Sequence, residues 1–268
     1  SLHADITQPM PQILGQFDVV ITCVSSRSGG RADAWAIDHD AQMNILQVAQ
    51  RLQAKQFIML SAICVQNPKL PFQFAKLAFE KALMASGLTY SIVRPTAFFK
   101  SLSGQIPRLR KGKAFLVFGN GELTACKPIS DDDLGNFIVD CITNRAKHNE
   151  ILPIGGPGPA VTPRDQAQAL FGLLDQPVKL RRVPVTLLRI ISGGLRLAGV
   201  LSPAAQRKAD LAEIGLYYAT QSMLVWKGPE QGYSEEKTAS TGTEHLFDHY
   251  AKVMRSGADI PRGDHSVF

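Results

Sequence analysis

The chain has 268 residues, enough for one large α/β domain or for one domain with an appended lobe. Its hydrophobic fraction of 45% and charged fraction of 19% exclude a disordered or fibrous chain. The formal net charge is +6, and no apolar run approaches the ~20 residues that a membrane span requires. Four cysteines, Cys23, Cys64, Cys126 and Cys141, lie far apart, which argues against zinc and iron–sulfur sites and favours a reducing compartment.

The first half of the chain alternates predicted strands and helices. Short apolar runs at 17–24, 57–60 and 90–93 stop abruptly at small or polar residues, as strands buried on both faces do. Between them, residues 38–52 and 74–85 carry apolar residues at helical spacing. This order predicts an α/β fold with a Rossmann-like, doubly wound parallel sheet.

The chain continues with two more predicted strands and then becomes mainly helical. The strands are expected at 115–118 and 151–154, with a helix between them that begins at the acidic residues 131–133. After Thr162 and Pro163, four helices are expected, at 163–175, 184–200, 203–217 and 244–256. We therefore expect two parts: residues 1–160 contain the sheet, and residues 161–268 form a smaller, mainly helical substrate lobe.

Three loops follow the predicted strands and point to a site. They cover residues 23–26, 61–64 and 94–99. Open α/β sheets bind ligands beyond the carboxyl ends of their strands, so these loops are expected to converge on one crevice. On the helix after Ser61, Phe72 and Lys76 are four residues apart and share a face. Lys76 is a candidate donor to a nicotinamide ribose; the alternatives are an exposed helix lysine and, for Ser61, a strand-end cap.

These residues resemble the short-chain dehydrogenase/reductase superfamily, in its atypical, NmrA-like branch. Members carry a Ser after the fifth strand and a Tyr-x-x-x-Lys on the next helix, where this chain has Ser61 and Phe72-x-x-x-Lys76. Six segments in order are similar to the divinyl chlorophyllide a 8-vinyl-reductase family. They are LSAICVQNPKLPFQFAKLAFE (60–80), YSIVRPTAFFKSL (90–102), ACKPIS (125–130), ILPIGGPG (151–158), IGLYYATQSML (214–224) and GYSEEKT (232–238).

The resemblance implies an NADPH-dependent oxidoreductase that reduces the 8-vinyl group of divinyl chlorophyllide or protochlorophyllide to ethyl. Residues 1–160 would then bind NADPH, with Lys76 and Ser61 as the catalytic residues. The cofactor-binding residues implied are Asp5, Ile6, Cys23, Val24, Ser25, Ser61, Ala62, Lys76, Pro95, Thr96 and Ala97. The substrate-binding residues implied are Cys64, Phe72, Phe98 and Phe99, where core packing is an equal alternative for the last two.

The sequence departs from the family pattern at two places. It has no Gly-x-x-Gly-x-x-Gly loop and starts just before His3-Ala4-Asp5-Ile6, so we expect it to lack the first β-α-β unit and to bind NADPH poorly alone. Phe72 replaces the tyrosine that protonates an alkoxide in carbonyl reductases. An ene-reductase does not need that phenol, because the tetrapyrrole ring delocalises the charge. The proton donor is open; Cys64 and Tyr217 are candidates.

Other functions and partners stay open at this point. A non-catalytic dinucleotide sensor fits the missing tyrosine, and another reductase or epimerase on the same scaffold, such as an isoflavone-reductase-like enzyme, is a second alternative. A flavin and iron–sulfur enzyme is disfavoured because it needs a cysteine cluster. Basic residues gather at 108–113 and 179–182, which indicates a solvated face or contact with an acidic substrate or anionic membrane surface. No nucleic-acid motif is present. Leu187, Leu188, Ile191, Leu195 and Leu201 are expected to line a tetrapyrrole cavity or the lobe core. The family implies a plastid or the cytoplasm of a phototrophic bacterium.

Overall fold

A computed structural model describes residues 5–8, 15–200 and 202–256. The chain divides into two compact units by its internal contacts. The first unit holds residues up to Pro95 together with Gly135–Pro153, and the second holds Thr96–Leu134 together with Ile154 onward. This partition differs from the expected boundary at residue 160, because residues 96–134 make their contacts mainly with later elements. The functional division into a cofactor domain and a substrate lobe stays a prediction.

The first unit is built on a parallel sheet. Strands β1 (Val19–Thr22), β2 (Gln56–Leu60) and β3 (Thr89–Pro95) are hydrogen-bonded in that order, and β5 (Glu150–Gly155) comes next. The parallel register aligns Val20 with Phe57 and Phe57 with Tyr90. The apolar runs seen in the sequence therefore are strands, and the prediction of a Rossmann-like parallel sheet is confirmed. All three strands end at the same edge.

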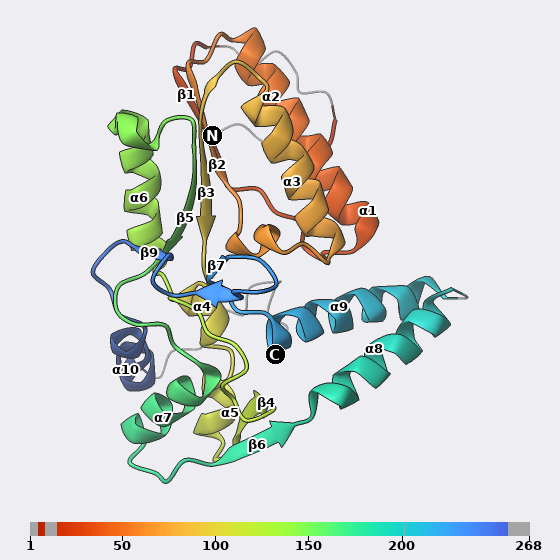
Figure 1. Cartoon of the computed structure of the whole chain (residues 1–268), viewed down its shortest axis with the longest axis vertical. Helices are drawn as coiled ribbons and strands as arrows, with labels where there is room; N and C mark the ends of the chain where they lie inside the picture. Colours follow the sequence, from red (N-terminus) through yellow and green to blue (C-terminus); the bar gives the residue numbers. More distant parts are fainter. Residues whose placement is uncertain (1–4, 9–14, 201, 257–268) are drawn as a thin grey trace. The chain divides into compact units, whose positions relative to one another are not determined.

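Helices cover both faces of this sheet (Figure 1). On one face lie α1 (Arg31–Ala34), the π-helical segment η1 (Trp35–Ala41), α2 (Gln42–Arg51) and α3 (Pro71–Met84); α6 (Asp131–Thr143) lies on the other. Two short 3-10 turns, η2 (Ile63–Gln66) and η3 (Arg145–Lys147), complete the unit. Both expected helices are found, and α3 starts earlier than predicted. The side chain of Gln73 accepts hydrogen bonds from the backbone N–H groups of Lys69 and Leu70, and Pro71 occupies the first turn, where its missing N–H costs nothing.

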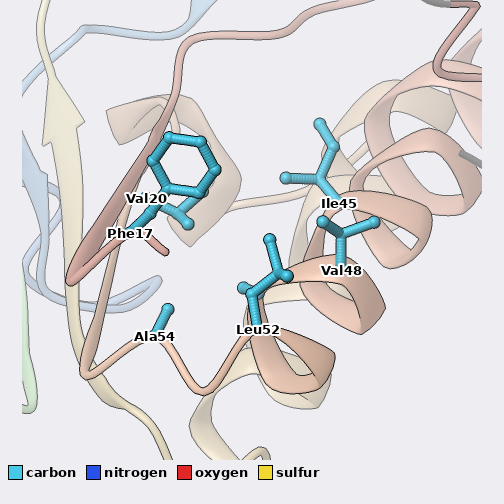
Figure 2. Close-up of a pocket in the computed structure, with 7 residues that line it drawn as sticks. Phe17, Val20, Ile45, Val48, Leu52 and Ala54 are labelled. Carbon is cyan, nitrogen blue, oxygen red and sulfur yellow. The ribbon is translucent and has the colours of Figure 1, made fainter. Parts of the chain in front are cut away.

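The core of the first unit lies between the sheet and the helices α2 and α3. Its buried side chains are Leu46, Ala49, Ala54, Phe57, Met59, Phe79, Leu83 and Ile92. An apolar pocket opens between β1 and α2, where Phe17 and Val20 face Ile45, Val48 and Leu52 (Figure 2). Its lining carries no polar side chain that could orient a dinucleotide, so this pocket is not the cofactor site.

The second unit has its own core and small sheets. Strand β4 (Phe115–Phe118) pairs in parallel with β6 (Leu180–Val183), and β7 (Val225–Trp226) pairs with β8 (Tyr233–Ser234). The end of β5 pairs with β9 (Ala239–Ser240). The helices are α4 (Phe99–Leu102), α5 (Ile106–Arg110), α7 (Pro163–Leu173), α8 (Val185–Gly199), α9 (Pro203–Thr220) and α10 (Leu246–Ser256).

The four helices expected after residue 160 are all found. They are α7, α8, α9 and α10, with ends within a few residues of the prediction. Helices α7 and α10 contribute to the core of this unit, which is formed by Phe99, Ile106, Leu109, Phe115, Val117, Val161, Ala167, Leu170, Phe171, Leu246 and Tyr250. Within the described ranges, no helix combines the length and the apolar character needed to cross a bilayer.

Candidate functional site

A buried polar network occupies the carboxyl ends of β1, β2 and β3. Helix α3 contributes two charged side chains to it, Lys76 and Glu80, which lie one turn apart on the same helix face. Both are almost fully buried, with 3% and 1% of their surface exposed. Buried charges need partners, because desolvation disfavours an isolated ion. Each of the two finds its partners at a different strand end.

Lys76 is held at the end of β1. Its Nζ lies 2.9 Å from Asp38 Oδ1 and donates to the carbonyl oxygen of Val24 at 3.4 Å. The same carboxylate oxygen accepts a hydrogen bond from the backbone N–H of Ser26 at 3.2 Å. The ammonium is therefore fixed against the loop that follows β1, and this interaction rules out the alternative of an exposed helix lysine.

Asp38 was not predicted, and its placement depends on the local helix geometry. It lies in η1, where the helix widens to π geometry before α2 begins, a distortion often found at functional sites. Its side chain is fully buried. A sequence signal existed: Asp38 falls on the same apolar stripe as Ala41 and Ile45, and a carboxylate on such a stripe calls for a buried cation.

Glu80 joins the ends of β2 and β3. Its carboxylate accepts a 2.5 Å hydrogen bond from the Ser61 hydroxyl and pairs with the Arg94 guanidinium through both Nε and Nη2. The backbone N–H of Ser61 donates to the carbonyl oxygen of Val93 at 2.7 Å. The Ser61 hydroxyl therefore donates its proton to Glu80 and keeps its lone pairs as hydrogen-bond acceptors.

Three polar oxygens near this network are buried without a hydrogen-bond partner among the described residues. They are Thr22 Oγ1, Asp38 Oδ2 and Gln42 Oε1. Gln42 belongs to the same cluster, since its Nε2 donates to the Val24 carbonyl oxygen at 3.5 Å. Two of these oxygens only accept hydrogen bonds, and a buried acceptor without a donor is costly. Ribose hydroxyls and a carboxamide are donors, so the polar character of this strand end fits a nicotinamide nucleoside.

The other predicted site residues of the first unit differ in their exposure. Cys23 and Ser25 are exposed, Ala62 is half-buried and Pro95 is buried. Desolvation by neighbouring atoms raises the pKa of the Cys23 thiol, which keeps it protonated at neutral pH. On α3, Phe72 is half-buried one turn before Lys76. Because residue 72 is phenylalanine, the side chain at this position carries no hydroxyl.

Two other predicted site residues, Cys64 and Ile6, are held through hydrogen bonds to their backbone carbonyl oxygens. The Cys64 carbonyl oxygen accepts from Gln73 Nε2 at 3.2 Å, and the Cys64 side chain is buried. The Ile6 carbonyl oxygen accepts from Asn44 Nδ2 of α2 at 2.9 Å. Hydrogen bonds from Thr7 lower the pKa of Asp5, whose carboxylate is exposed. His3, Ala4 and Leu201 lie outside the described residues.

The segment after β3 belongs to the second unit. Thr96 donates its backbone N–H to the Ile154 carbonyl oxygen at 2.9 Å and its hydroxyl to the Lys127 carbonyl oxygen. The Ala97 carbonyl oxygen accepts from the Ile129 N–H at 3.0 Å. Phe99 is 4% exposed and belongs to the hydrophobic core, whereas Phe98 is half-buried. The core-packing alternative therefore describes Phe99, and Phe98 is the better candidate for contact with a substrate.

A parallel sheet with helices on both faces and buried polar groups at its strand ends is the architecture of a Rossmann-type nucleotide-binding protein. The comparison with protein families agrees, since residues 3–145 match the NAD(P)H-binding family. Among solved structures, an NADPH-dependent quinone oxidoreductase from Escherichia coli complexed with NADPH superposes with a TM-score of 0.61. The superposition covers 88% of this chain and 76% of the quinone oxidoreductase chain. At 16% sequence identity it shows a shared fold.

The chain belongs to the divinyl chlorophyllide a 8-vinyl-reductase family. The chloroplastic enzyme of that name from Zea mays is 43% identical over 100% of this chain and 69% of its own length. Its counterpart from Arabidopsis thaliana is 49% identical over 90% of this chain. The chain spans 59% of the length of the Arabidopsis protein, so the site described above corresponds to part of those relatives.

Proposed function

We propose that this protein reduces the 8-vinyl group of divinyl chlorophyllide or protochlorophyllide to ethyl, with NADPH as the electron donor. The observation that carries the proposal is family membership combined with a site in which Lys76 is retained and Phe72 replaces the expected tyrosine. The compartment proposed is a plastid, as in the relatives named chloroplastic, or the cytoplasm of a phototrophic bacterium.

The residues at the strand ends would bind and orient the cofactor. Bound NADPH supplies the hydride for the reduction. Lys76, held in place by Asp38, would donate to the ribose, and Ser61 would accept a hydrogen bond beside it. Neither side chain needs to move protons for this role. Catalysis would depend mainly on holding two flat rings within reaction distance, which is a positional effect.

Phe72 accounts for the choice of reaction. Its position on α3, one turn before Lys76, is the one from which a phenol would protonate a substrate oxygen. A phenyl ring has no proton to give, so reduction of a carbonyl at this site has no acid. A vinyl group conjugated to a tetrapyrrole makes no such demand, because the ring takes up the negative charge until a proton arrives. Within the first unit, Cys64 would border the macrocycle.

The direct test is a pigment assay on the purified full-length protein. We expect incubation with NADPH and divinyl chlorophyllide to shift the Soret absorbance to that of the monovinyl pigment. Lys76→Met should lower kcat/KM by about 100-fold, since loss of a positioning contact misplaces the reacting rings. Lys81→Met is the matched control, because Lys81 lies on the same helix with an exposed side chain, and it should leave the rate unchanged.

Phe72→Tyr separates this proposal from an ordinary carbonyl reductase. The added hydroxyl should leave turnover of the vinyl substrate unchanged or lower it. A substantial rise in turnover would show that the reaction needs a phenol and would overturn the proposed role of Phe72. NADPH binding without any change in pigment absorbance would instead favour a dinucleotide sensor.

A further inference from the structure

Helix α8 has two apolar sides, and α9 covers only one of them. The side that packs toward α9 contains buried Ser192 with half-buried Leu188 and Leu195. The opposite side is exposed to an unusual degree: Ile190 is 71% and Leu197 79% exposed. Leu187 and Ile191, which are 47% and 44% exposed, lie at the margin between this side and the side toward α9. Exposed apolar side chains that recur on successive helix turns are uncommon on a surface that contacts only water.

Helix α8 and the residues next to it in the chain are basic. Between Asp175 and Asp210 the chain has no acidic residue. The basic residues in that interval are Lys179, Arg181, Arg182, Arg189, Arg196, Arg207 and Lys208. Arg189 and Arg196 are exposed and seven residues apart, so they lie on one face of α8 beside the apolar stripe. The Arg196 guanidinium lies 3.8 Å from the carboxylate of Glu213 in α9. The Arg196 side chain is 78% exposed and the Glu213 side chain 33%.

An apolar stripe flanked by arginines is the pattern of a helix that lies in a membrane interface, with apolar side chains among acyl chains and cations at the headgroups. We propose that the exposed side of α8, defined by Leu187, Ile190, Ile191 and Leu197, docks the protein on a bilayer that contains anionic lipids. A second copy of this chain fits the surface less well, because pairing two such faces would bring Arg189 and Arg196 of both copies together. The inference does not rest on the proposed enzymatic activity.

Vesicle sedimentation tests the docking surface on the whole protein. With vesicles of phosphatidylglycerol and phosphatidylcholine, we expect binding at low salt that weakens at about 0.5 M NaCl, where surface charges are screened. Pure phosphatidylcholine vesicles should bind far less protein. Ile190→Glu and Leu197→Glu should each weaken binding to the anionic vesicles about tenfold or more, since a carboxylate replaces an inserted apolar group. Arg189→Glu should reduce the preference for anionic lipid.

Val139→Glu is the matched control. Val139 is 60% exposed on α6, so the same change is made to an exposed apolar side chain outside α8, and vesicle binding should be retained. Circular dichroism checks that all variants are folded. Equal binding by wild type and the two α8 variants, or equal binding to neutral and anionic vesicles, would overturn the proposal. So would an effect of Leu197→Glu confined to oligomeric state or to the KM for the pigment, because the stripe would then cover a second copy or the substrate.

Discussion

At the scale of single residues, the informative feature is a lysine buried with its counter-ion. The sequence places Lys76 one turn after Phe72 and near Ser61, but it does not show which acid neutralises the ammonium. The structure assigns that role to Asp38, which shares one oxygen between Lys76 Nζ and the Ser26 N–H. Removal of one partner from a buried pair of this kind is costly, because it leaves an uncompensated charge in the interior.

We expect Asp38→Asn to lower the free energy of unfolding by about 3–5 kcal/mol, because a buried ammonium would be left without a counter-charge. Urea unfolding measures the change. The double variant Asp38→Asn with Lys76→Met should recover part of it, since both charges are then removed. Asp18→Asn serves as the comparison: Asp18 pairs with Lys55 at 2.8 Å on the surface, and its loss should be undetectable. If both single variants were equally mild, Lys76 would not be confined by Asp38.

At the scale of elements, helix boundaries could be predicted where capping residues are local. Helix α7 begins where Thr162 and Pro163 predict it. The Thr162 hydroxyl accepts from the Asp165 N–H at 3.2 Å, and the Asp165 carboxylate accepts from the Thr162 N–H at 2.9 Å. Helix α3 begins earlier than its apolar periodicity indicates, because the amide of Gln73 caps it. The N-cap residue is Leu70 instead of Ser or Thr, so the sequence carries only the Gln73 half of the capping-box signal.

Replacement of the α7 cap tests this local account. Thr162→Ala should destabilise the protein by about 1 kcal/mol, because the hydroxyl that accepts from the Asp165 N–H is lost. Thr162→Ser keeps that oxygen and should stay close to wild type. Thermal unfolding followed by circular dichroism provides the comparison. If serine were as damaging as alanine, the methyl group of Thr162 rather than its hydroxyl would be the stabilising part.

At the scale of the whole molecule, the chain has two hydrophobic cores in two units. Phe79 belongs to the first and Phe171 to the second, and both are buried. The two tryptophans of the sequence are divided between the same units: Trp35 lies in η1 and Trp226 in β7. Each unit therefore contains its own fluorescent probe, and unfolding need not follow a single two-state transition.

A truncated side chain in one core should lower the urea midpoint reported by the tryptophan of the same unit more than the midpoint reported by the other tryptophan. In a Trp226→Phe background, Phe79→Ala should move the Trp35 unfolding midpoint to lower urea, as expected for a loss of about 3–5 kcal/mol from a buried ring. In a Trp35→Phe background the same change should move the Trp226 midpoint much less, and Phe171→Ala should show the reverse. Equal shifts at both probes would show that the two cores unfold as one cooperative unit.

The sequence by itself determined the elements and the kind of site. Runs of apolar residues and helical periodicity are local patterns, so β1, β2, β3 and the principal helices could be predicted, together with the strand-end position of Ser61 and the phenyl ring in place of a phenol. Only the tertiary structure decided which groups meet: Asp38 with Lys76, Glu80 with Arg94, β4 with β6, and Phe99 with the other core residues. Partner choice depends on which distant segments are buried together, and that is a property of packing, which no short stretch of sequence specifies.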